Sequence, residues 1–232
     1  MKIGRYELRI SHQKKFIFFS KPKCATTSIR KKLDKYSDIL STDNAPYHHH
    51  TTALQLKIHF NQMGWDWNNY FKFITLRNPW DMVVSFYHYA KPDLNGIYFW
   101  EEARLGVKRE KNKRMPFEQW ILSKDIKKSW HGLLYKGGEF HENIWTNDFS
   151  FFTLNNFILD ENGDSLVDYI VKVENLRKEL KVVFNKIGIP FIWIRKLNKS
   201  KHKDYKLYYS PETKKIIERE FQYDIEIGEY EF

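Results

Sequence analysis

The stretch FIFFSKPKCATTSIRKKL, residues 16–33, joins four apolar residues, a basic turn without glycine and a run of hydroxyl residues. Residues 16–19 predict a short buried strand, because a brief apolar run ends at the turn-forming residues SKPK. From Thr27 the pattern becomes helical: Ile29 and Leu33 lie four residues apart on one face, and basic residues occupy most of the other. The stretch therefore predicts a strand, a turn of a size that suits an anion, and a helix.

The turn has the chemistry of a phosphate or sulfate site. A turn that leads from a strand into a helix presents backbone N–H groups and the positive end of the helix dipole, which together bind such anions. Lys23 adds an ammonium group, and Thr26, Thr27 and Ser28 add three hydroxyls. An ordinary capped helix beside a surface lysine has a similar composition, because hydroxyl caps are common. The stretch alone leaves both interpretations open.

A Walker loop differs from this turn. Its pattern Gly-x4-Gly-Lys-Ser/Thr wraps bare backbone around phosphates, and a later strand supplies an Asp that helps to hold Mg²⁺. Here Cys24 and Ala25 stand where glycines are expected, and the later strand YFKFITLRN ends at Arg77. A phosphate site without an obvious carboxylate for a metal favours a donor whose transferred group needs no divalent cation. Sulfuryl transfer fits, because SO₃ carries less charge than a phosphoryl group and hydrogen bonds from Lys and His can stabilise its transition state.

Composition predicts one folded domain over residues 1–232, since 42% of the residues are hydrophobic and 17% aromatic. No apolar run approaches the roughly 20 residues of a membrane span, and the first residues lack the apolar stretch of a signal peptide, so we expect a soluble cytoplasmic protein. Cys24 is the only cysteine, which excludes an internal disulfide. The formal charge of +10 predicts attraction to polyanions without choosing among nucleotide, nucleic acid, acidic polysaccharide and membrane.

Further strands and helices alternate along the chain. A helix is expected after Thr51, a buried strand up to Asn78–Pro79 and a helix directly after it. The segment SLVDYIVKVENL predicts a strand that runs into another helix, and the last helix is capped by Ser210 with Pro211 at its first position. A short helix is expected at PFEQWILS. This order predicts an α/β architecture with a mostly parallel central sheet flanked by helices.

The segments KPKCATTSI and LRNPWDMVVSFY together resemble the two nucleotide-binding motifs of sulfotransferases that use 3′-phosphoadenosine 5′-phosphosulfate (PAPS). The resemblance implies that PAPS is the donor co-substrate, that no metal is needed, and that Arg77 and Ser85, eight positions later, bind the 3′-phosphate. A fixed guanidinium can bind a phosphate through two parallel hydrogen bonds, and Ser85 lies two turns into the following helix. The residues that the first motif implies for the 5′-phosphosulfate are Lys23, Cys24, Ala25, Thr26, Thr27 and Ser28.

Other segments resemble carbohydrate-type sulfotransferases of the sulfotransferase family 2-like kind. They are HHHTTALQLK, VDYIVKVENLRKEL and YYSPETKKIIEREFQYDIEIGEYEF. The resemblance implies a P-loop-like PAPS-binding sulfotransferase fold, with residues 91–150 as a variable region on the acceptor side. Two residues depart from the pattern: Ala25 stands where many relatives have glycine, and Lys172 where relatives often have arginine. The basic segment 195–206 would close over the nucleotide.

The resemblance also implies catalytic roles. Lys23 would bond the oxygen that bridges sulfur and the 5′-phosphate, and a histidine suits a general base near neutral pH. His50 fits the family's His-x-Thr-Ala pattern, although a histidine there could instead cap the helix or bind the nucleotide. Neighbouring His48 and His49 remain alternatives, as do the carboxylates Glu101 and Glu102. A metal site made of three adjacent histidines is disfavoured, because sequence neighbours seldom converge on one ion.

The acceptor is less defined by the sequence. Trp100, Trp130 and Trp145 lie in the region outside the resemblance, together with the run RLGVKREKNKR at 104–114, in which six of eleven residues are basic. Aromatic faces suit sugar rings and the basic run would suit an anionic glycan, whereas each tryptophan could equally be core and the run a solvated surface.

Three functions therefore compete. The favoured one is a sulfotransferase that moves a sulfuryl group from PAPS to an acceptor hydroxyl of a carbohydrate, releasing 3′-phosphoadenosine 5′-phosphate (PAP). The second is a basic nucleic-acid-binding protein that stacks bases on its aromatics, which the absence of an RNA-binding or zinc-finger pattern disfavours. The third is a PAPS-binding module without catalysis, which an intact Lys23 and an available His50 disfavour.

Overall fold

The structure is a computed structural model that describes residues 8–40, 47, 50–99, 102, 106, 108–123, 134–136, 139–141, 149–191 and 202–232. The chain divides into two compact units. The first comprises Met1–Arg77, Gly132–His141 and Leu154–Asn198, and the second comprises Asn78–His131, Glu142–Thr153 and Lys199–Phe232. The single domain expected for residues 1–232 stays a prediction.

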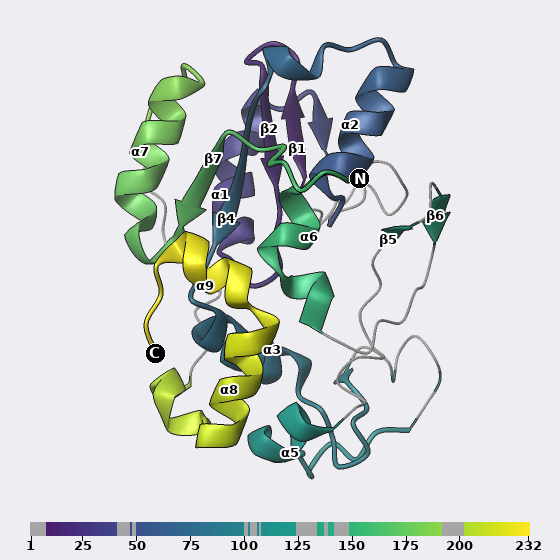
Figure 1. The fold of residues 1–232 in the computed structure, drawn as a ribbon, viewed down its shortest axis with the longest axis vertical. Helices are drawn as coiled ribbons and strands as arrows, with labels where there is room; N and C mark the ends of the chain where they lie inside the picture. The colour runs from purple at the N-terminus through teal and green to yellow at the C-terminus, as the bar shows by residue number, and fades with distance from the viewer. Residues whose placement is uncertain are drawn as a thin grey trace. The chain divides into compact units, whose positions relative to one another are not determined.

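A five-stranded sheet forms the centre of the first unit as far as the chain is described, with the order β3-β1-β2-β4-β7 (Figure 1). The neighbours β2, β4 and β7 are parallel, and β1 pairs antiparallel with both β2 and β3. Four of these five strands therefore run in one direction, which confirms the mostly parallel sheet predicted from the sequence. The strands are β1 Arg9–Ser11, β2 Phe16–Phe19, β3 Ile39–Leu40, β4 Phe71–Leu76 and β7 Tyr169–Lys172.

Strand register brings three carboxyl ends together. Phe19 of β2 pairs with Ile74 of β4, and Leu76 of β4 pairs with Lys172 of β7. The segments that follow these three strands thus leave the sheet at the same edge, at neighbouring positions about 4.8 Å apart. In open α/β sheets this edge is where ligands bind.

Helices cover both faces of the sheet, which is why β2 and β4 are almost continuously apolar. On one face, Phe18 and Phe73 share a buried core with Ile29 of α1 (Thr26–Leu33) and Leu180 of α7 (Leu176–Lys186). Figure 1 shows α7 beside β7, which it contacts. On the other face, Trp67 packs against Phe19 and against Phe60 of α2 (Ala53–Gln62), with ring centroids 6.3 and 5.3 Å apart. The first unit also contains η1 Asp34–Tyr36, η2 Trp67–Asn69, α6 Leu154–Ile158, η5 Val173–Asn175 and a two-stranded sheet of β5 Leu134–Lys136 and β6 Glu139–His141.

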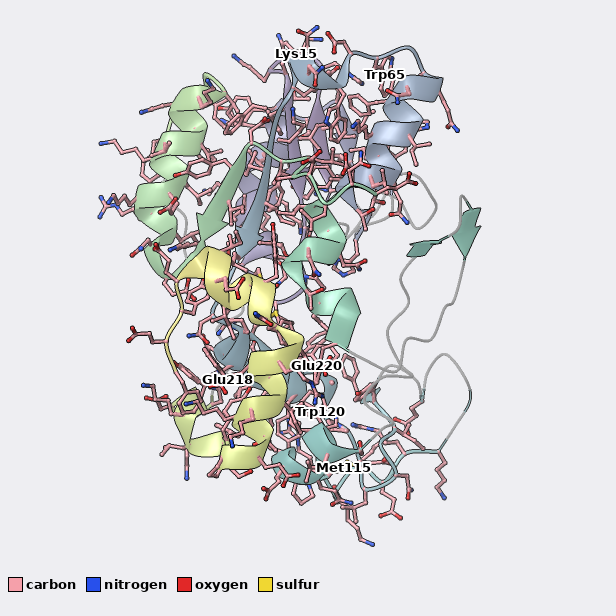
Figure 2. All side chains as sticks on the ribbon, in the orientation of Figure 1. Lys15, Trp65, Met115, Trp120, Glu218 and Glu220 are labelled. Atoms are coloured by element: carbon pink, nitrogen blue, oxygen red, sulfur yellow. The ribbon has the colours of Figure 1, made fainter. Side chains whose placement is uncertain are left out.

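The second unit is helical in its described residues and is held together by aromatic side chains. Its elements are α3 Pro79–Ala90, α5 Phe117–Leu122, η4 Phe149–Phe152, η6 Tyr205–Tyr208, α8 Pro211–Glu220 and α9 Gln222–Gly228. Trp120 of α5 lies near Met115 (Figure 2) and packs against Tyr87 of α3 with ring centroids 5.2 Å apart. The hydroxyl of Tyr87 donates a 2.6 Å hydrogen bond to the Met115 carbonyl, which fixes α3 against the segment before α5.

Some elements differ from the sequence prediction. Strands β1 and β3 were not predicted, because they are very short and exist through pairing with distant residues. Arg9 of β1 is fully buried and bonds Asp34 at 2.7 Å. The short helix α6 was not predicted either. The last helix, expected to be continuous, is two helices that meet at Phe221, whose backbone (φ −113°, ψ 25°) leaves the helical region.

Candidate functional site

The loop between β2 and α1 has an unusual backbone. Lys23 and Ala25 both have positive φ, 60° and 59°, whereas Cys24 between them does not. Such a conformation is uncommon for residues other than glycine. Alternation of left- and right-handed residues turns successive N–H groups toward one point and forms an anion-binding concavity. Ala25 thus adopts the left-handed conformation that glycine adopts at lower energetic cost.

Helix α1 begins directly at this loop. Ala25 is its N-cap residue and provides no side-chain cap, and no acidic residue lies in the first turn. Helices α2, α3 and α8 instead begin with side-chain caps from Thr52, Asn78 and Ser210. Thr26 and Ser28 are buried in the first turn of α1. An anion at this loop would therefore meet the positive end of the helix dipole without competition from a carboxylate of that turn.

Arg77 joins this loop from the end of β4. Its Nη1 donates a 3.1 Å hydrogen bond to the carbonyl oxygen of Lys23, 54 residues earlier in the chain. The contact follows from the register, because the ends of β2 and β4 are neighbours in the sheet. The structure therefore brings together Lys23 and Arg77, which belong to two separate sequence motifs.

His50 contacts the residue at which the loop begins. Its side chain is only 7% exposed, and Nδ1 lies 3.0 Å from the carbonyl oxygen of Ser20, the residue after β2. A carbonyl can only accept, so the neutral ring carries its hydrogen on Nδ1 and its lone pair on Nε2. That tautomer is the one in which Nε2 can take a proton. His48, His49 and Glu101 lie outside the described residues, and Glu102 forms a 3.4 Å ion pair with Lys111 in the second unit.

Lys21 is a member of the loop that the sequence did not single out. Its side chain is fully buried, and lysine is almost never fully buried unless it is paired. Lys21 and Lys23 flank Pro22, so two ammonium groups belong to this short loop. The doubled lysine in SKPKC was the available signal, although burial could not be predicted from it.

A cavity adjoins the end of β7, again within the first unit. Its volume is about 680 Å³, it is open to solvent, and its charged lining residues are exposed. Three cations and one carboxylate line it, together with Phe191, so its net positive charge favours an anionic ligand. The charged residues are Arg177, Lys178, Lys181 and Glu174.

Ser85 lies in α3 of the second unit and is buried. Its helix is well defined at the start: Pro79 occupies the first position, and the Asn78 side chain accepts hydrogen bonds from the N–H groups of Trp80 and Asp81 at 3.1 and 3.3 Å. The shared role of Ser85 and Arg77 in binding one phosphate stays a prediction.

Two basic residues of the region expected on the acceptor side contact other residues of the protein. In the 104–114 run, Lys113 pairs with Glu110, and the Arg114 guanidinium lies 3.8 Å from the centre of the Tyr87 ring. Burial, with Arg114 and His202 nearby, lowers the pKa of His88 from 6.5 to about 4, so this histidine is neutral at neutral pH. Three tryptophans considered for the acceptor, Trp100, Trp130 and Trp145, lie outside the described residues, as do residues 195–201.

The described residues contain neither a candidate metal cluster nor a candidate membrane-spanning helix. No group of three or more His, Cys, Asp or Glu side chains there is arranged to hold a metal ion. None of the helices in the described part of the chain has the length and apolar character to cross a membrane.

Fold and site together define an α/β protein with a basic loop, left-handed at two residues, at the carboxyl edge of its sheet. No protein-family model matches the sequence, and no curated protein matches it significantly. Among solved structures, the chain is similar to mouse sulfotransferase SULT7A1 complexed with PAP, with a TM-score of 0.47 and 14% identity over 96% of this chain and 91% of that one. A likeness of this degree does not establish a shared activity, which therefore has to rest on the residues of this chain.

Proposed function

We propose that the protein is a PAPS-dependent sulfotransferase that transfers a sulfuryl group to a hydroxyl of a carbohydrate. The observation that carries this proposal is the left-handed, lysine-containing loop whose Lys23 carbonyl is bound by Arg77. Lys23 of the first motif and Arg77 of the second thereby lie together at one edge of the sheet. The described residues near this loop offer hydrogen-bond donors and cations, which is the chemistry that a nucleotide with phosphates at both ends needs.

The order of these features along the edge supports such a nucleotide. The loop follows β2, Arg77 follows β4, and the cavity with Phe191 follows β7. Adjacent strands are about 4.8 Å apart, so the ends of β2 and β7 are about 10 Å apart. The 5′-phosphosulfate would lie on the loop, the 3′-phosphate at Arg77 and the adenine toward the cavity.

In the proposed reaction, the acceptor oxygen attacks sulfur while the acceptor proton passes to Nε2 of His50. A new O–S bond forms as the bond between sulfur and the bridging oxygen breaks, and PAP leaves with its added negative charge. Lys23 would donate a hydrogen bond to that bridging oxygen, and the hydroxyls and N–H groups of residues 26–28 would hold the phosphate. The bond from His50 to Ser20 supports its role, because it keeps the ring in the tautomer that can accept the proton.

Calorimetric titration tests the donor. The full chain is titrated with PAP, and in parallel with ATP in the presence and absence of magnesium. We expect PAP to bind without any metal and at least about tenfold more tightly than ATP, because only PAP carries the 3′-phosphate for Arg77. Preference for ATP with magnesium would overturn the proposal in favour of phosphoryl transfer. Absence of PAP binding together with salt-sensitive binding of an oligonucleotide would favour the nucleic-acid alternative.

A further inference from the structure

Arg77 makes a contact that binding of a 3′-phosphate does not require. Its Nη1 bonds the main-chain oxygen of Lys23, which is the residue proposed to act on the leaving group. The Lys23 backbone is left-handed, with φ of 60°, a conformation that is uncommon for residues other than glycine and that its surroundings can stabilise. The bond to Arg77 is one such stabilising contact, and it comes from a residue 54 positions away.

The orientation of one peptide bond depends on this contact. In a trans peptide the C=O and N–H groups point in opposite directions, so a donor that holds the Lys23 oxygen also directs the N–H of Cys24 to the opposite side. If this peptide rotated by half a turn, its carbonyl would take the place of that N–H. A carbonyl oxygen in the anion-binding concavity would repel a phosphate, whereas an N–H attracts it.

We infer that Arg77 is a positioning residue for the Lys23–Cys24 peptide, so that recognition of the 3′-phosphate is coupled to the shape of the loop that holds the 5′ end. The inference rests on the proposed function. One guanidinium has five N–H groups, so it can bond the carbonyl and a phosphate at the same time. A bound 3′-phosphate fixes the guanidinium, and the fixed guanidinium holds the loop. The donor's 3′-phosphate is then a requirement for an ordered catalytic loop as well as a source of affinity.

The test uses a ligand that cannot touch Arg77 through a 3′-phosphate. Adenosine 5′-monophosphate (AMP) and PAP are titrated into the parent protein, Arg77→Ala, and Arg219→Ala, which also loses one positive charge but from an exposed position beside Glu220. We expect Arg77→Ala to weaken AMP binding about five- to tenfold, as for the loss of one ordinary intramolecular hydrogen bond, and to weaken PAP binding considerably more. Unchanged AMP affinity in Arg77→Ala would overturn the inference and leave Arg77 with the 3′-phosphate alone.

A measurement without ligand tests the inference independently of the proposed function. Hydrogen exchange of the backbone amides in residues 23–28 is compared between the parent and Arg77→Ala, with the amides of α7 as an internal reference for global stability. Faster exchange confined to residues 23–28 supports the positioning role, and exchange equal to the parent overturns it. If the parent binds neither PAP nor AMP, the proposed function fails, while the exchange result still decides whether Arg77 holds the loop.

Discussion

Replacement of His50 separates its structural bond from its proposed catalytic role. Asparagine places its side-chain N–H₂ group near the position of Nδ1 and can keep the 3.0 Å bond to the Ser20 carbonyl, but it has no basic nitrogen where Nε2 lies. Alanine removes both. A matched pair, His50→Asn and His50→Ala, therefore distinguishes a base from a histidine that only fixes the loop.

The magnitudes follow from burial and bonding. His50 is 7% exposed and Ser20 is 1% exposed, so His50→Ala takes a donor from a buried carbonyl and should lower the free energy of unfolding by about 1–3 kcal/mol. His50→Asn should lose less than about 1 kcal/mol, since it retains that bond. Both variants should transfer sulfuryl groups at least about a hundredfold more slowly, the lower end of what general-base catalysis contributes.

The assay has two parts. Urea denaturation gives the free energy of unfolding, and transfer of radiolabelled sulfate from PAPS to a panel of saccharides gives the rate with the best acceptor. PAP affinity measured by calorimetry should stay within about twofold of the parent in His50→Asn, because the base acts on the acceptor. Parental turnover in His50→Asn would refute the base assignment, and would move it to His48, His49 or a carboxylate.

Three further predictions concern Arg77, Asn78 and His88. Arg77→Ala should weaken PAP binding by about 2–4 kcal/mol through loss of a charged partner, measured by calorimetry; unchanged affinity would remove Arg77 from the site. Asn78→Ala should lower the free energy of unfolding by about 1–2 kcal/mol in urea titrations, because Trp80 and Asp81 lose their cap, whereas Asn78→Asp should retain most of it. The pKa of His88 is lowered from 6.5 to about 4 in the folded protein. As the pH falls, His88 of the unfolded chain therefore binds a proton before His88 of the folded protein does. The free energy of unfolding should decrease progressively between pH 6.5 and 4, because the stability that this group contributes above pH 6.5 is lost there. His88→Gln should flatten that part of the pH profile, and an unchanged slope would contradict the assignment.

Local sequence patterns were enough to predict the elements whose ends are set by residues within or next to the element itself. The apolar run at 16–19 is β2 as predicted, and the helix expected from Thr27 begins one residue earlier, at Thr26. The helix expected directly after Asn78–Pro79 begins at Pro79 itself, and the last helix begins at Pro211 as predicted, since a side-chain cap and a proline at the first position act within one turn. Such elements depend on interactions between near neighbours in the chain, and the sequence displays these directly.

The candidate site was only partly predictable. The motifs named Lys23, Arg77 and His50, but no local pattern showed that Arg77 bonds the Lys23 carbonyl or that His50 bonds Ser20. These contacts join residues 54 and 30 positions apart. The first contact exists because the parallel register of β2 and β4 places the ends of the two strands side by side.

The sequence by itself determined strands β2, β4 and β7 with the helices that follow them, the basic hydroxyl-rich loop and the two motifs that resemble nucleotide-binding segments, because these are properties of short segments. Only the tertiary structure decided the left-handed conformation of Ala25, the burial of Lys21 and the pairing of β1 with β2 and β3. The physical reason is that a conformation of higher local energy, a buried charge or a three-residue strand is stable only when distant residues compensate its cost. The chain brings those residues together only when it folds.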